Sequence, residues 1–116
     1  MITVIVKMNN KGKLNSRICP SKDYFYFTIN DNNEQSLDLN QTKEVSVNGD
    51  VINLEIRLKY FGINKEYIVR YSSNIKNRKA NEIIVKYAAN NINGLEVYYN
   101  NERMKRAYLE EKMLLS

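Results

Sequence analysis

The chain has 116 residues, a typical length for one domain, and we expect a single domain over 1–116. Its 18 Lys and Arg residues outnumber 13 Asp and Glu, and the net charge of +5 favours acidic partners. The absence of histidine excludes histidine-dependent triads and the commonest neutral metal ligand. Cys19 is the single cysteine, so no internal disulfide is required and a cytoplasmic location is expected. The apolar runs are too short for a transmembrane helix, and we expect no membrane partner.

Alternating apolar and polar residues predict the first strand, over 2–8. The residues of its apolar face are Ile2, Val4, Val6 and Met8. The second predicted strand, 24–29, has aromatic residues on both faces, which favours a central or covered position in a sheet. A polar connection over 30–34 follows it.

The stretch 43–71 predicts three consecutive antiparallel strands. Asn48-Gly49 is typical of a type I′ hairpin turn, which would place Val45 opposite Ile52. A second turn, centred on Gly62-Ile63, would join the next two strands in a register that matches opposite charges on one face and apolar residues on the other. The expected pairs are Lys59 with Glu66, Glu55 with Arg70, Leu58 with Tyr67, Ile56 with Val69, and Leu54 with Tyr71. We interpret these charged residues as cross-strand partners rather than ligands.

After a polar, basic loop over 72–81, two more strands are predicted at 82–88 and 95–99. Asn100 or Asn101 then has the character of a helix cap, and a helix is expected as far as Leu115. The residues expected on one face of this helix are Met104, Ala107, Tyr108, Glu111 and Leu115. The expected fold is mainly β: a small antiparallel β-barrel or sandwich of six to seven strands with one C-terminal α-helix.

No motif of catalysis or metal binding is found in the sequence. The four glycines are scattered, whereas a phosphate-binding loop needs them close together. The stretch beginning at Asp31 has the acidic composition of a calcium loop. It carries Ser36 where the turn needs glycine and Thr42 where a glutamate ligand is required. Cys19 precedes Pro20, lacks a histidine partner and is interpreted as a small buried apolar residue. We predict a non-enzymatic protein without metal or cofactor.

Charge is segregated along the chain. Residues 1–22 carry five bases and no acid, 23–55 carry seven acids and one base, and 56–116 carry twelve bases and six acids. Strands that interleave in space would mix these segments, so a basic surface is one of two alternatives. Three basic clusters near aromatic residues suit phosphate neutralisation with base stacking. The candidate nucleic-acid-binding residues are Lys11, Lys13, Lys76, Arg78, Lys79, Arg103, Lys105, Arg106, Tyr98 and Tyr99.

The sequence therefore favours a small regulatory protein that binds RNA or single-stranded nucleic acid. The alternative is a protein-interaction module, an inhibitor or adaptor of a partner protein, that uses the acidic segment and the apolar end of the chain. A second copy of the chain is a further candidate partner. Asn, Lys, Ile and Tyr, whose codons are AT-rich, make up 51 of the 116 residues. This bias suits an AT-rich bacterium, or a plasmid, transposon or phage living in one, with codon drift as the alternative.

Overall fold

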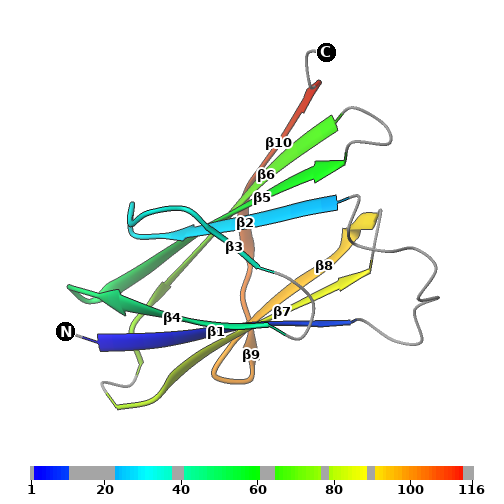
Figure 1. The fold of residues 1–116 in the computed structure, drawn as a ribbon. Helices are drawn as coiled ribbons and strands as arrows, with labels where there is room; N and C mark the ends of the chain where they lie inside the picture. The colour runs from blue at the N-terminus through cyan, green and yellow to red at the C-terminus, as the bar shows by residue number, and fades with distance from the viewer. Residues whose placement is uncertain are drawn as a thin grey trace.

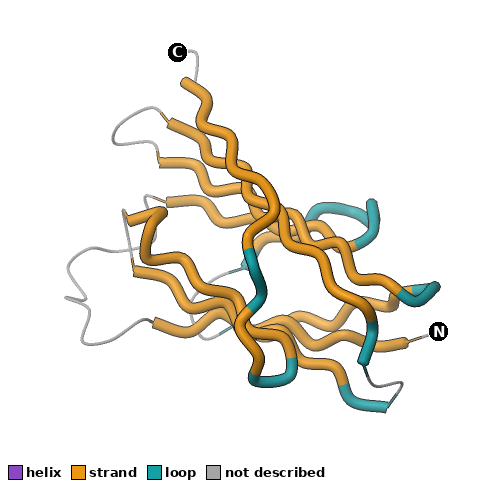
Figure 2. The backbone as a smooth tube through the Cα atoms, turned by 180° about the vertical axis from the view of Figure 1, so that it is seen from behind, coloured by secondary structure: helices purple, strands orange, loops and turns teal. Residues whose placement is uncertain are grey.

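The structure, a computed structural model, describes residues 2–10, 23–37, 41–60, 65–76, 79–88 and 91–113. Within these ranges the chain forms ten strands and no helix (Figures 1 and 2). The strands are β1 (Ile2–Asn10), β2 (Asp23–Ile29), β3 (Gln35–Ser36), β4 (Thr42–Val47), β5 (Val51–Tyr60), β6 (Lys65–Asn74), β7 (Asn81–Ala88), β8 (Asn91–Tyr99), β9 (Glu102–Arg103) and β10 (Arg106–Met113).

Two five-stranded sheets form the architecture. The first sheet has the order β4-β1-β7-β8-β9, and the second has the order β10-β6-β5-β2-β3. All neighbouring strands are antiparallel except β1 and β7, which are parallel. The described strands do not close into a ring, because β10 and β3 end one sheet while β4 and β9 end the other. The barrel alternative is therefore wrong, and two open sheets take its place.

The hydrophobic core lies between the sheets and follows the alternation of the strands. Burying each large apolar side chain contributes about 1.5–3 kcal/mol, so these inward faces dominate the stability of the fold. The largest fully buried side chains are Tyr99, Phe27, Ile29, Leu37, Ile52, Leu54, Ile56, Leu58, Ile83, Val4 and Val6. Both sheets contribute to this one cluster.

The seven strands predicted from the sequence are all present. The five expected pairs between β5 and β6 are also confirmed, from Lys59 opposite Glu66 to Leu54 opposite Tyr71. This hairpin is predictable because both of its faces specify the same register: a slip by one residue would turn every apolar side chain outward. The extra strands β3 and β9 have two residues each, too few to show an alternating pattern.

The hairpin expected at Asn48-Gly49 is wrong. β4 pairs with β1, so Val45 lies opposite Val4, while β5 pairs with β2 and β6 in the other sheet. A type I′ turn needs positive φ at both central residues. Here Gly49 has a φ of 99°, and Asn48 is not among the residues with positive φ. The turn consequently carries the chain from one sheet to the other instead of folding β5 back onto β4.

The expected helix from Asn100 or Asn101 to Leu115 is also wrong. Both asparagines have positive φ, 47° and 70°, and form the turn of a β8–β9 hairpin in which Tyr99 pairs with Glu102. Asparagine tolerates this left-handed conformation better than most residues, which is why it suits a type I′ turn as well as a helix cap. Residues 106–113 then form β10 beside β6, because strand pairing outweighs their good helix propensity.

The Asn100 turn is held by the neighbouring strand. The Asn100 amide nitrogen Nδ2 donates to the Ala80 carbonyl at 3.1 Å, and its Oδ1 accepts from the Glu82 backbone at 2.8 Å. Asn30, which begins a second turn with positive φ, makes the same two kinds of bond to β5. At both turns an asparagine side chain thus satisfies one backbone C=O and one backbone N–H at the end of the adjacent strand. This role accounts for part of the asparagine content.

Candidate functional site

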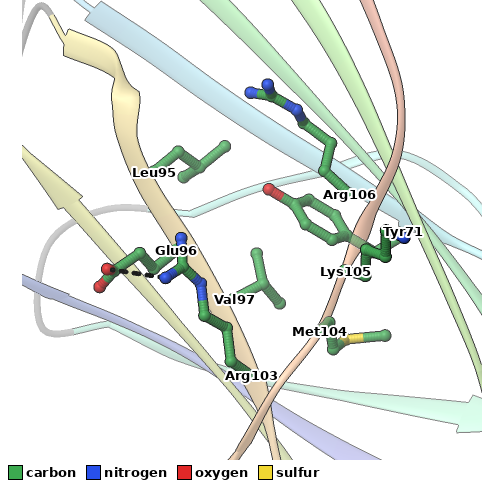
Figure 3. A pocket seen from close by; sticks show the side chains of 8 residues that line it. All are labelled: Tyr71, Leu95, Glu96, Val97, Arg103, Met104, Lys105 and Arg106. Atoms are coloured by element: carbon green, nitrogen blue, oxygen red, sulfur yellow. Dashed lines mark ion pairs between the residues drawn. The ribbon is translucent and has the colours of Figure 1, made fainter.

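A pocket of about 480 Å³ opens where the chain crosses from the first sheet to the second, between β9 and β10 (Figure 3). One wall comes from β8 and another from β6. The third wall comes from residues 103–106, the crossing segment between the two sheets. The lining residues are Tyr71, Leu95, Glu96, Val97, Arg103, Met104, Lys105 and Arg106. Three of these eight residues are basic, and all three were candidates from the sequence.

Met104 fixes the crossing segment. Its side chain is buried, and its backbone N–H donates to the Val97 carbonyl at 2.7 Å. Arg103, Lys105 and Arg106, which flank this anchor, are exposed. The Asn100 turn sends the chain back along β8, and the buried methionine then holds the three basic residues against the pocket. The Asn100 turn and the buried Met104 therefore determine where the three basic residues lie, and the helix expected from the sequence does not.

The charge at the pocket is only partly neutralised. An Arg103 guanidinium nitrogen, Nη1, lies 3.7 Å from Oε1 of Glu96. Within the part of the chain that the structure describes, Lys105 and Arg106 make no ion pair. Three cations therefore face one carboxylate, an arrangement that favours a bound anion such as a phosphate.

Tyr71 lines the pocket beside Arg106, which is its partner across the β6–β10 ladder. The residue is 3% exposed, and burial raises the pKa of its hydroxyl, although Arg106 and Arg103 oppose this effect. The phenol therefore stays neutral at physiological pH and keeps a proton to donate. Figure 3 shows the ring between the crossing segment and β8. Sequence reasoning missed this residue, because its contact with Arg106 exists only once β10 is a strand.

Tyr98 lies on the outer face of the first sheet, opposite Arg103 of β9. The Lys86 ammonium lies 4.8 Å from the centre of its ring, and its hydroxyl donates to Glu96 at 3.3 Å. Glu96 therefore links the ring of Tyr98 to the pocket. Of the two candidate tyrosines, this is the one with a partly exposed side chain.

Tyr99 does not have the exposed position that base stacking requires. Its side chain is 1% exposed and belongs to the core. The hydroxyl donates to Oδ1 of the buried Asn81 and accepts from the Lys76 backbone N–H at 3.1 Å. The alternation of β8 explains the difference, since adjacent residues in a strand point to opposite faces. Tyr99 is therefore a structural residue, and Tyr98 keeps the candidate role.

The loop cluster of the sequence consists of Lys76, Arg78 and Lys79, and neither Lys76 nor Lys79 lines the pocket. The Lys76 side chain forms an ion pair with Glu102, which is exposed. Lys79 is also exposed. The candidates Lys11, Lys13 and Arg78 lie outside the described residues. The structure therefore brings together Arg103, Lys105 and Arg106.

The outer face of the second sheet mixes the acidic and basic segments of the sequence. Arg57 donates to Glu66 at 2.9 Å and to Glu34 at 3.0 Å, and the bond to Glu66 raises the pKa of the guanidinium. Arg70 pairs with Glu55 at 3.0 Å, as the predicted register requires. A second pocket, of about 500 Å³, includes this Arg70–Glu55 pair. Arg57 and Arg70 on this face are already neutralised, which makes the first pocket the better anion site.

Replacing Arg57 by alanine should lower the free energy of unfolding by about 1–3 kcal/mol, because buried Glu66 would lose its charged donor. Replacing Arg70 is the matched control: its ion pair with Glu55 is exposed and should be worth less than about 1 kcal/mol. Urea unfolding of both variants provides the measurement. Equal losses would contradict the structural role assigned to the Arg57–Glu66 pair.

The described residues contain no group of three or more potential metal-ligating side chains. Within the same part of the chain, no helix is long and apolar enough to span a membrane. Comparisons with protein-family models, curated proteins and solved structures find no match to this chain. The functional interpretation therefore depends on the pocket and the exposed surfaces.

Proposed function

We propose that this protein acts by binding single-stranded nucleic acid, RNA in the first instance, through the pocket between β9 and β10. The observation that supports this function is the presence of Arg103, Lys105 and Arg106 on one pocket with a single carboxylate, Glu96. Guanidinium and ammonium groups bind phosphates through charge-assisted hydrogen bonds, which are among the stronger contacts in water. The protein has no catalytic role in this proposal.

The size and chemistry of the pocket suit a nucleotide unit within a longer strand. Its volume of about 480 Å³ lies within the usual range of ligand sites, about 300–1,000 Å³. Arg103, Lys105 and Arg106 would each contact a phosphate. Tyr71 would donate a hydrogen bond from its neutral hydroxyl. Tyr98, on the neighbouring outer face, supplies a ring on which a base could stack once Lys86 moves aside. Electrostatic attraction carries most of the affinity, with little dependence on base sequence.

The first experiment measures affinity for unstructured RNA and single-stranded DNA at about 50 and 200 mM salt. Three phosphate contacts give a slope of about −2 on logarithmic axes, so affinity should fall roughly 20-fold between these two conditions. A steep loss supports the proposal. Absence of binding at the lower salt, or binding that does not change with salt, would contradict it.

The second candidate function, a protein-interaction module, is favoured by a different feature. Three of the four large hydrophobic residues that the described chain exposes lie on one strand, β10. The fourth, Val51, lies at the start of β5. An apolar strand at the edge of a sheet is a common surface for binding another protein. We propose that both activities take place in the cytoplasm, because a chain with one cysteine needs no oxidising compartment.

A further inference from the structure

The four sheet edges of the described structure differ in how well they are protected. β3 and β9 are two residues long, too short to template another strand. β4 has six residues, but its inward Val45 and Val47 are buried, and Asn32 donates to its Ser46 carbonyl at 3.0 Å. β10 has eight residues, contains no proline, and pairs only with β6 among the described strands. It is the least protected long edge.

β10 also carries an uncovered apolar surface. Leu109 pairs with the fully buried Val69, so it lies on the core-facing side of the second sheet, yet it is 41% exposed. Met113, on the same side, is 67% exposed, and Tyr108 on the other side is 39% exposed. Figure 1 shows β10 rising away from the first sheet toward the C-terminus, which leaves this end of the second sheet without an opposite layer.

The sequence of β10 is complementary to itself when read antiparallel. Residues opposite each other in an antiparallel pair point to the same face, so a symmetric pairing must be centred on one residue. Centred on Glu111, it sets Glu110 against the partner's Lys112 and Leu109 against the partner's Met113, each twice by symmetry. Glu111 would face its own copy, but each Glu111 is already paired with Lys65 of its own chain at 2.7 Å.

The neighbouring registers are less favourable. Centring the pairing on Glu110 sets that carboxylate against its own copy and Lys112 against the partner's Tyr108, so no opposite charges meet across the pair. Centring it on Leu109 sets Arg106 against the partner's Lys112, two like charges. Of these three registers, the one centred on Glu111 matches opposite charges on one face and apolar residues on the other.

We propose that β10 pairs antiparallel with β10 of a second copy of this chain, centred on Glu111, so that the second sheets of the two copies form one continuous sheet. Backbone hydrogen bonds along the open edge would supply affinity, and the Glu110–Lys112 and Leu109–Met113 matches would set the register. The self-complementary sequence of β10 favours a second copy of the chain as the occupant. Pairing with a strand of a different protein would not require β10 to be complementary to itself. The dimer is independent of nucleic-acid binding.

Charge reversal tests this pairing. Sedimentation velocity at about 5–100 μM should show a dimer for the native chain. Glu110→Lys opposes two lysines twice per dimer and should raise the dimer dissociation constant at least tenfold. Glu44→Lys makes the same charge change on the edge strand β4, where Glu44 is exposed, and should leave the dimer unchanged. A monomeric native chain, or equal weakening by both variants, would overturn the proposal.

Mixing two variants gives a sharper test. Lys112→Glu should also weaken its own homodimer, because it opposes carboxylates at positions 110 and 112. An equimolar mixture of the Glu110→Lys and Lys112→Glu chains places opposite charges at every contact and should restore the dimer to native affinity. Circular dichroism confirms that each single variant is folded. Two folded variants that stay monomeric when mixed would contradict the Glu111 register.

Cross-linking identifies the central residue directly. In a Cys19→Ser background, Glu111→Cys places two thiols opposite each other at the proposed axis and should form a dimer on mild oxidation. Leu109→Cys is the control, because its thiol would face Met113 and should stay reduced. Cross-linking of Leu109→Cys in preference to Glu111→Cys would overturn the proposed register. A native chain that is monomeric but incorporates another protein's strand would overturn the choice of occupant.

Discussion

Alanine at Arg103, Lys105 and Arg106 together should lower the affinity for single-stranded RNA by roughly 100-fold at about 0.1 M salt. The estimate follows from three phosphate contacts on a single strand, each of which releases about 0.7 of a counterion. The slope of affinity against salt should flatten by about two for the same reason. The loss should be similar for unrelated RNA sequences, because phosphate contacts carry no sequence information. Fluorescence anisotropy over a salt series measures both quantities.

A matched variant separates the pocket from the total charge of the protein. Alanine at Lys7, Lys59 and Lys65 also removes three positive charges, but none of these residues lines the pocket. Lys7 and Lys65 already form ion pairs, with Glu82 and Glu111, and Lys59 lies over the ring of Tyr26. This variant should lose less than about threefold in affinity. Equal losses for the two variants would show that net charge, rather than the pocket, determines binding.

The loop cluster provides a second comparison. Alanine at Lys76, Arg78 and Lys79 removes the same charge from the candidates that the sequence placed between two strands. Lys76 is already engaged by Glu102, so we expect a smaller loss than for the pocket variant. A larger loss for the loop variant would move the binding site from the pocket to the loop.

The sequence predicted those parts of the fold that local pairing determines. The β5–β6 register follows from residues within one hairpin, where charge on one face and apolar residues on the other specify the same alignment. The strand with which β4 pairs could not be predicted, because Asn48-Gly49 is compatible with a hairpin and with a crossing between sheets. Its partner β1 lies about forty residues earlier in the chain, and such long-range pairings leave no local signal.

Local sequence patterns were also insufficient to predict the candidate site, which lies in the C-terminal part of the chain. Asn100-Asn101 suits a helix cap and a left-handed turn equally, and the residues after it have good helix propensity. Arg103, Lys105 and Arg106 were therefore identified as a basic cluster but placed on a helix. Tyr71 and Glu96, which complete the pocket, come from strands that approach this segment only in the folded protein. The sequence identified the three basic residues as a cluster. Their neighbours in the pocket, Tyr71 and Glu96, could be identified only from the tertiary structure.

The adjacent residues Tyr98 and Tyr99 allow a matched test of the fold. Phenylalanine at Tyr99 should lower the free energy of unfolding by about 1–3 kcal/mol, because a buried hydroxyl would no longer donate to Asn81 or accept from Lys76. Those two bonds tie β8 to the start of β7 and to the chain just after β6. The ring itself still fills the core, so the loss should come from the hydroxyl alone.

Phenylalanine at Tyr98 removes the same atom from a partly exposed ring whose hydroxyl makes one bond, to Glu96 at 3.3 Å. Its cost should be within about 0.5 kcal/mol, since water can replace that bond at the surface. Urea unfolding followed by circular dichroism measures both variants, with equal slopes against denaturant showing that the unfolded states are comparable. If Tyr98→Phe cost as much as Tyr99→Phe, the assignment of inward and outward faces on β8 would be wrong. The pocket, whose wall includes the neighbouring Glu96 and Val97, depends on that same assignment.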